Sequence, residues 1–194
     1  AASYGPSIPT TFKPVLWTAP GAFTELERVP GHASGSAADV SRSSQGPGSR
    51  LVVGYSTTAS NHAHRVPGAV PVYWAFPSLS PLQLPFPAGV SAEFGEARCV
   101  SGNGRVIAGN LYHFVNGLVE STACVWIRRP GHHSGDFMPY VLAQPPGKAS
   151  GWVTGISDDG RVIAGYGFDD LLDFDTNTPC LWRSSGPPPT MTFG

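Results

Sequence analysis

An internal repeat of roughly 55 residues limits the folds open to this chain more than any other feature of its sequence. Four short segments end in tryptophan, at Trp17, Trp74, Trp126 and Trp182, with spacings of 57, 52 and 56 residues. A unit of this size forms one supersecondary structure and cannot bury its own apolar face. Neighbouring units must therefore pack on one another.

A second signature recurs between the tryptophans. Gly35, Gly95 and Gly151 each precede a serine by six residues, and a polar turn, an arginine and an apolar segment closed by glycine follow. In the second and third units, 17 residues separate this closing glycine from the tryptophan. The matching segments are residues 101–109 and 157–165, and residues 50–54 after a longer Ser/Gly/Pro-rich turn in the first unit.

Each unit has the composition of four short strands. Asn103-Gly104 and Asp159-Gly160 supply the positive φ of a tight hairpin, so a Val-Ser strand is expected to pair antiparallel with a Val-Ile-Ala strand. A third strand carries the tryptophan. A weaker fourth strand follows it, at residues 23–26, 82–84 and 140–142.

These features predict an all-β fold of repeated four-stranded antiparallel sheets, either β-propeller-like or β-solenoid-like. The single repeat domain (1–194) contains three full units, at approximately 18–74, 75–126 and 127–182, and partial terminal segments 1–17 and 183–194. Helices are not expected, because no long stretch has sustained helical periodicity. The four repeat tryptophans are predicted to occupy equivalent buried positions rather than to stack on sugars. Trp152 lies outside the repeat register and is expected to be exposed.

The repeat resembles the HAF-type extracellular repeats. Residues 35–54, 95–109 and 151–165 carry the first half of the resemblance and the four tryptophan segments carry the second, over roughly residues 14–182. The chain departs from that pattern in having Ser where Asn is common, and in lacking an Asp-Leu-Gly segment after the tryptophan. The resemblance implies an exported, propeller-like repeat protein and brings no catalytic residues with it.

Composition excludes several classes of function. Charged residues make up 13% of the chain and the net charge is −1, with no basic run, so a nucleic-acid partner is not expected. Apolar runs are far shorter than the roughly 18 residues of a membrane helix, so no transmembrane segment is expected. A surface with so little charge favours coverage by other protein.

The first three residues predict where the protein is located, and the cysteines predict its disulfide status. Residues Ala1-Ala2-Ser3 are typical of the product of signal-peptide cleavage, which predicts an extracellular or periplasmic protein; an arbitrary chain boundary is the alternative. Cys99, Cys124 and Cys180 allow at most one intrachain disulfide. Their apolar neighbours favour buried free thiols.

Candidate sites are few. Asp173, Asp175 and Asn177 have the opening spacing of a calcium loop, but Thr178 stands where that loop has glycine and no glutamate closes it. Calcium at these three residues is the one cofactor hypothesis. His62, His64, His132 and His133, with Asp136, match no zinc signature and are interpreted as solvated loop residues. No nucleophile elbow, phosphate loop or paired-carboxylate pattern occurs, so the chain is interpreted as no enzyme.

Two functions are favoured over a third, an enzyme domain. The first is an exported, non-catalytic structural protein that packs against copies of itself or other protein subunits. The alternative is an extracellular binding module that presents the loops before each tryptophan strand to a glycan or protein. The incomplete terminal segments further predict that residues 1–17, 183–194 or both are ordered by contact with another chain, by addition to its open sheet edge.

Overall fold

In the part of the chain that it describes, the computed structural model contains thirteen β-strands and no helix. It describes residues 11–42, 50–58, 68–115, 118–129, 136–169 and 177–186. Every strand pairing is antiparallel, which confirms the all-β class and the repeated antiparallel sheets expected from the sequence. Within these described segments there is accordingly no helix of a length and hydropathy suited to crossing a membrane.

The strands form four open sheets, each ordered as in the sequence. Sheet 1 contains β1 (Val15–Ala19) and β2 (Ala22–Glu25). Sheet 2 contains β3 (Ser34–Val40), β4 (Leu51–Thr57), β5 (Ala69–Ala75) and β6 (Pro81–Gln83). Sheet 3 contains β7 (Phe94–Val100), β8 (Val106–Val115), β9 (Leu118–Arg128) and β10 (Phe137–Val141). Sheet 4 contains β11 (Ser150–Ile156), β12 (Val162–Phe168) and β13 (Thr178–Arg183).

The sheets do not begin and end where the sequence repeat does. The strand that follows each tryptophan pairs with that tryptophan's own strand: β2 with β1, β6 with β5 and β10 with β9. A repeat unit that ends at Trp74 or Trp126 therefore cuts one sheet between its third and fourth strands. Each unit still contains four strands, but its first strand belongs to the preceding sheet.

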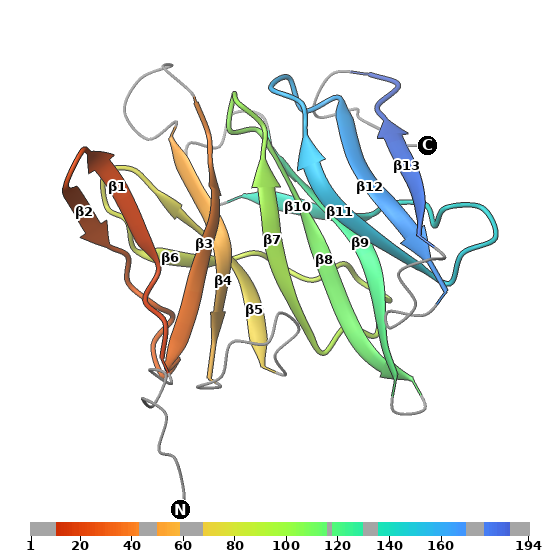
Figure 1. The fold of residues 1–194 in the computed structure, drawn as a ribbon, viewed down its shortest axis with the longest axis horizontal. Helices are drawn as coiled ribbons and strands as arrows, with labels where there is room; N and C mark the ends of the chain where they lie inside the picture. The colour runs from red at the N-terminus through yellow and green to blue at the C-terminus, as the bar shows by residue number, and fades with distance from the viewer. Residues whose placement is uncertain are drawn as a thin grey trace, which may run out of the picture.

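The four sheets stand face to face in a row (Figure 1). Sheet 1 lies at one end of the row and β13 at the other. The first strands β3, β7 and β11 lie side by side along the front of the molecule, and β6 and β10 lie behind. This is the arrangement of consecutive propeller blades, in an array that is open at both ends.

The polar turns form as the sequence predicts. The Ser101 hydroxyl donates to Asn103 Oδ1 and accepts from Val106 N, and Gly104 has φ +66°. In sheet 4 the Ser157 hydroxyl donates to Asp159 Oδ1 and accepts from Val162 N. The glycine of that turn, Gly160, has φ +75°. The serine, the carboxylate or amide, and the glycine together satisfy the backbone of the hairpin.

A β-bulge in the first strand of sheets 2, 3 and 4 explains the closing glycine. The register shifts at residues 37/39, 97/99 and 153/155. Next to the bulge, the carbonyl oxygen of Glu96 lies so close to Gly109 that a Cβ there would overlap it. Ser36 and Gly54, and Trp152 and Gly165, form the same contact in sheets 2 and 4. Only glycine fits at these positions.

The repeat tryptophans hold the row together. Trp74, Trp126 and Trp182 are buried, and each indole N–H donates at 2.7 Å to a carbonyl oxygen of the segment that follows the last strand of the preceding sheet. The acceptors are Glu27, Pro85 and Ala143. Each bond satisfies a polar group that burial would otherwise leave unpaired.

The prediction that all four tryptophans are buried is wrong for Trp17, whose side chain is 68% exposed. Trp17 occupies the same place in β1 that Trp74 occupies in β5. In the described chain no sheet precedes sheet 1, so nothing covers this side of it. Burial of the repeat tryptophan thus depends on the sheet before it and not on its own strand.

The expected exposure of Trp152 is also wrong, because its side chain is only 6% exposed. Its ring stacks on Tyr166 of the neighbouring strand at 6.2 Å and packs against Tyr112 of sheet 3 at 5.8 Å. Trp152 and Glu96 precede equivalent bulges in β11 and β7, so Trp152 lies in register with the repeat after all. Trp152 is a core residue at a repeat position different from that of the four repeat tryptophans.

Candidate interaction surfaces

Two kinds of sheet face alternate along the row. One face of each sheet carries its tryptophan, and we call it the tryptophan face. The opposite face carries the residue before the tryptophan, and we call it the receiving face. In the apolar clusters that contain the buried repeat tryptophans, the tryptophan face of the later sheet packs on the receiving face of the earlier one.

The contact between sheets 2 and 3 shows this pattern. On the receiving face of sheet 2, Val53 and Tyr73 are buried against the tryptophan face of sheet 3, where Ile107 and Trp126 lie. Between sheets 3 and 4, Val125 and Ala108 take the receiving positions and pack in the same cluster as Ile163 and Trp182. Between sheets 1 and 2, Leu16 and Leu26 pack with Val52 and Trp74.

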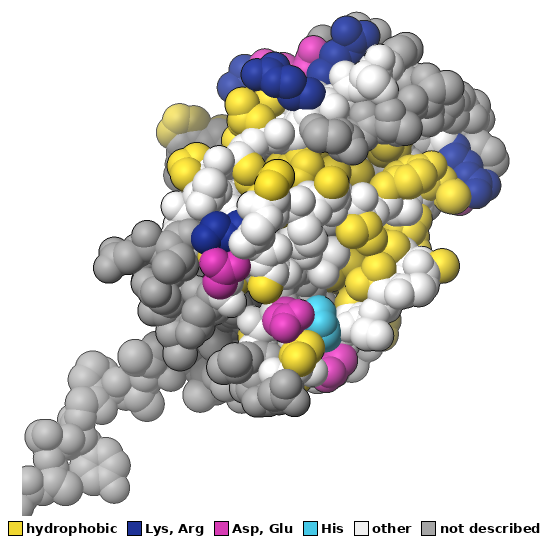
Figure 2. Space-filling model, turned by 90° about the vertical axis from the view of Figure 1, so that its right-hand side faces the viewer, with side chains coloured by type: hydrophobic (Ala, Val, Ile, Leu, Met, Phe, Trp, Pro, Cys, Tyr) yellow, Lys and Arg dark blue, Asp and Glu magenta, His cyan; other side chains and the backbone are white. Residues whose placement is uncertain are grey.

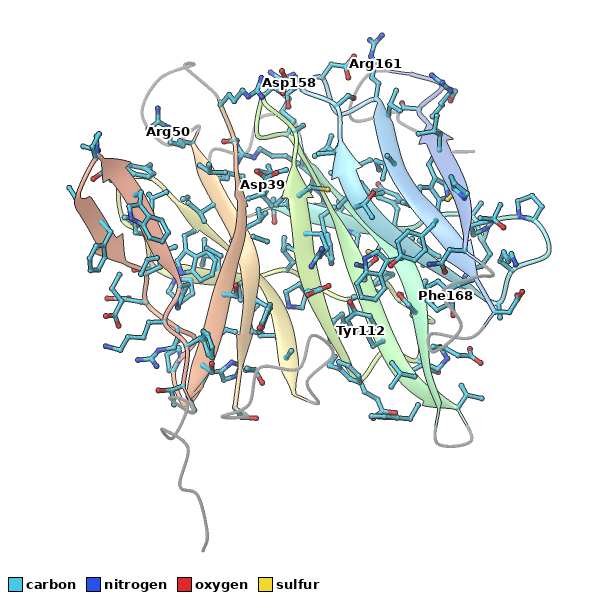
Figure 3. The ribbon with its side chains drawn as sticks, in the orientation of Figure 1. Asp39, Arg50, Tyr112, Asp158, Arg161 and Phe168 are labelled. Atoms are coloured by element: carbon cyan, nitrogen blue, oxygen red, sulfur yellow. The ribbon has the colours of Figure 1, made fainter. Side chains whose placement is uncertain are left out.

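Polar groups fix the relative placement of the sheets. Asp39 Oδ2 accepts from Val100 N at 2.9 Å and links sheet 2 to sheet 3. Asn110 is fully buried, and its Oδ1 accepts from Val153 N at 2.8 Å, which links sheet 3 to sheet 4. Asp158 and Arg161 lie at the turn end of the sheets, and Tyr112 and Phe168 at the opposite end (Figure 3).

At one end of the row, the tryptophan face of sheet 1 is uncovered. Trp17 is directly opposite Phe23 in the β1–β2 pairing, with ring centroids 6.5 Å apart. Phe23 is 63% exposed. Two adjacent aromatic rings therefore face solvent where, in the other sheets, the tryptophan is buried.

At the other end, the receiving face of sheet 4 is uncovered. Leu181 is 52% exposed, whereas Val125, its equivalent in sheet 3, is fully buried. In the β12–β13 register Leu181 is opposite Ala164, with Val162 and Tyr166 on the same face. These last three side chains are half-buried. Figure 2, which faces this end, shows a band of hydrophobic side chains.

These end faces were not identified from the sequence. The repeat register itself contains the signal, because Leu16, Tyr73, Val125 and Leu181 all directly precede a tryptophan. What the register does not state is which of these positions lacks a covering sheet.

The calcium prediction falls largely outside the described residues. Asp173 and Asp175 are not described, and Asn177 is a half-buried residue directly before β13. Calcium binding by these residues stays a prediction. Within the described part of the chain, no three His, Cys, Asp or Glu side chains are grouped so as to hold a metal ion.

The histidine pairs and the variable loops are also mostly undescribed. His62, His64, His132 and His133 fall outside the described segments, and Asp136 lies just before β10, where its carbonyl accepts from Arg129 N. The loops that precede the tryptophan strands lie largely in residues 59–67, 116–117 and 170–176, which the structure does not describe.

One buried carboxylate lies where three sheets meet. The Glu96 side chain is 5% exposed; it accepts from the Tyr112 hydroxyl at 2.7 Å and lies 3.7 Å from Arg98 Nη1. The Arg98 guanidinium in turn lies 5.9 Å from the centre of the Trp152 ring. Burial raises the pKa of Tyr55, and the charge of Glu96 raises it further. The Tyr112 hydroxyl and the nearby Arg98 guanidinium thus give the buried Glu96 carboxyl polar partners within the packed sheets.

The segment between β2 and β3 lines an open hollow of about 420 Å³. Its polar groups support the fold: Glu27 O accepts from Trp74, Val29 N donates to Ser56 Oγ, and Arg28 donates to Ala33 O. The hollow is a consequence of the connection between sheets 1 and 2.

The three cysteines are free thiols. Cys99 and Cys124 are buried and Cys180 is half-buried. Burial raises the pKa of Cys99 to about 12 and that of Cys124 further. Buried thiols of this kind are poor nucleophiles and poor metal ligands.

Comparison with known proteins adds no relative: the chain matches no protein-family model, and neither the curated proteins nor the solved structures contain a detectable match to it.

Proposed function

We propose that this chain is a non-catalytic structural module that assembles through its sheet faces, with copies of itself or with other protein subunits. One observation carries the proposal. The position before the tryptophan is fully buried at Val125 in sheet 3 and 52% exposed at Leu181 in sheet 4. The same kind of surface that holds the row together is left uncovered at its end.

The chemistry of this surface favours protein as the occupant. The end face of sheet 4 presents aliphatic and aromatic side chains from two paired strands and offers few charged groups along the band in Figure 2. Apolar surface gains free energy when it leaves water, and a flat sheet face is complementary to another sheet. With a net charge of −1, little electrostatic repulsion opposes association.

We also propose that the module works outside the cytoplasm. This rests on the resemblance of residues 14–182 to HAF-type extracellular repeats. Fractionation of the source cells, with mass spectrometry of the mature N-terminus, tests this part separately.

Sedimentation velocity of the purified chain over a wide concentration range tests assembly. We expect the mass to rise with concentration and the association to persist at high salt, because apolar contacts are not screened. A chain that stays monomeric at the highest concentration would contradict self-assembly.

A further inference from the structure

The two uncovered faces of the row are of the two kinds that meet inside the chain: a tryptophan face at sheet 1 and a receiving face at sheet 4. Inside the chain, each interface joins the residue before one tryptophan to the next tryptophan: Leu16 with Trp74, Tyr73 with Trp126, and Val125 with Trp182. Two members of this series have no such partner in the described chain. They are Trp17 on the tryptophan face of sheet 1 and Leu181 on the receiving face of sheet 4.

We propose that copies of this chain stack head to tail, with the tryptophan face of sheet 1 of one copy on the receiving face of sheet 4 of the next. This rests on the proposed assembly function and names its partner and its polarity. Trp17 then takes the place against Leu181 that Trp182 takes against Val125. The interface between copies repeats the interface within a copy.

A second copy fits these faces better than an unrelated partner does. The chain builds the same contact from its own residues three times, so the shape of a tryptophan face already matches that of a receiving face. The two faces cannot meet within one molecule, because sheet 1 and sheet 4 lie at opposite ends of the row (Figure 1).

The chemistry of each end agrees with this arrangement. At the receiving end, Leu181, Ala164 and Val162 present aliphatic groups on one face of β12 and β13. At the other end, Trp17 and Phe23 present the aromatic rings that would cover them. No described residue accepts a hydrogen bond from the Trp17 indole, whereas the three buried indoles each have a backbone acceptor.

This geometry differs from addition of terminal strands to a sheet edge. The contact uses faces, and Phe12 already pairs within its own chain: Gly35 N donates to Phe12 O at 3.1 Å, and Phe12 N donates to Ser34 Oγ at 2.9 Å. A head-to-tail contact is heterologous. It closes into a ring if the rotation between copies permits and otherwise extends into a filament.

Two charge substitutions test the polarity of the contact. Trp17→Glu places a charge on the tryptophan face of sheet 1 and leaves the receiving face of sheet 4 intact. Leu181→Glu places a charge on the receiving face of sheet 4 and leaves the tryptophan face of sheet 1 intact. Each side chain is more than half exposed, so neither change disturbs the packing within one copy. Circular dichroism and the melting temperature check that each variant is folded. Leu82→Glu is the matched control, because Leu82 is a 43% exposed leucine of β6 in sheet 2, which carries neither of the two end faces.

We expect each single variant to sediment as a monomer at concentrations where the wild type and Leu82→Glu associate. An equimolar mixture of Trp17→Glu and Leu181→Glu should form a heterodimer and nothing larger, because only one functional interface remains per pair. Light scattering or sedimentation velocity measures both results.

Three outcomes would overturn the proposal, and they differ in what they leave standing. If a single variant still self-associates, the contact joins like faces or lies elsewhere, and the assembly function survives. If the mixture stays monomeric while the wild type associates, head-to-tail stacking is wrong and assembly again survives. A monomeric wild type removes the stacking proposal and the self-assembly part of the proposed function, and leaves only assembly with other protein subunits.

Discussion

The indole N–H of Trp126 donates a hydrogen bond to the carbonyl oxygen of Pro85, 2.7 Å away in the segment that follows the preceding sheet. Trp74 with Glu27 and Trp182 with Ala143 repeat this bond at the same distance. A large aromatic ring and one fixed hydrogen bond thus join each sheet to the one before it. The bond selects tryptophan at this position, because Phe lacks the donor and Tyr places its hydroxyl elsewhere.

The first prediction compares two tryptophans of the repeat. Trp126→Ala should lower the free energy of unfolding by about 3–5 kcal/mol, because it empties a fully buried site. Trp126→Phe keeps most of the ring but leaves the Pro85 carbonyl without its donor, and should cost about 1–3 kcal/mol. Urea unfolding followed by circular dichroism measures both values.

Trp17→Ala is the control for this series, measured on dilute, monomeric protein. Since Trp17 is 68% exposed, its loss should change the free energy of unfolding by no more than about 0.5 kcal/mol. Equal destabilisation by Trp17→Ala and Trp126→Ala would show that the two tryptophans are equivalent after all.

The second prediction concerns the closing glycine of the repeat. Gly109→Ala should destabilise the chain by more than about 2 kcal/mol, because the new Cβ would overlap the Glu96 carbonyl oxygen beside the bulge. Gly155→Ala is the matched control within a strand, since nothing lies within 4 Å of a Cβ at that position. Thermal unfolding of the two variants separates these effects; a well-tolerated Gly109→Ala would mean that the bulge is not formed as described.

Much of the fold could be predicted from the sequence because the repeat shows it directly. The dipeptides Asn103-Gly104 and Asp159-Gly160 predict tight turns from local sequence alone. The spacing from these turns to Trp126 and Trp182 gives the order of the strands. The sheet boundaries could not be read in the same way. Nothing in the sequence of β6 or β10 shows whether that strand pairs with the tryptophan strand before it or with the first strand of the next sheet. The short connection to the tryptophan strand decides the pairing.

The candidate surfaces were harder to predict, because exposure here depends on position in the row. Leu181 and Val125 hold the same register position and have similar apolar character, yet only Val125 is covered by a following sheet. The prediction that Trp152 is exposed failed for a related reason, because its burial depends on other sheets. This burial depends on Tyr112 of another sheet, a contact that no local pattern encodes.

The third prediction uses two turns that differ in one group. Asp159 Oδ1 accepts from Ser157 Oγ at 2.6 Å and from Arg161 N at 3.0 Å, and these bonds hold the pKa of Asp159 below its usual value. Asn103 makes the same two bonds, to Ser101 Oγ and Arg105 N, without a charge. A carboxyl group whose pKa is lowered by folding stabilises the native state above its unfolded pKa, and that stability is lost as the pH falls through the folded pKa.

Asp159→Asn should therefore reduce the loss of stability between neutral pH and pH values below about 4, the ordinary pKa of Asp. Asn103→Asp should introduce an additional loss of the same kind at the sheet 3 turn. Urea midpoints of the three proteins at neutral and acidic pH measure the difference. Parallel pH profiles for all three would contradict this account of the turn. The effect is expected to be small, because Asp159 is exposed to solvent.

The last prediction concerns the cysteines. A thiol reagent attacks the thiolate, and burial raises the pKa of Cys99 to about 12, raises that of Cys124 further and raises that of the half-buried Cys180 as well. At mildly alkaline pH the native chain should therefore react at Cys180 alone, and the unfolded chain at all three cysteines. Cys180→Ser should abolish labelling of the native protein.

A thiol whose pKa is raised by folding stabilises the native state below its unfolded pKa and loses that contribution as the pH rises towards the folded value. Stability should consequently decline above about pH 8.5, the ordinary cysteine pKa, and Cys124→Ala should reduce this alkaline decline. Rapid labelling of Cys99 in the native state, or a disulfide between any two of the three, would contradict the buried free thiols.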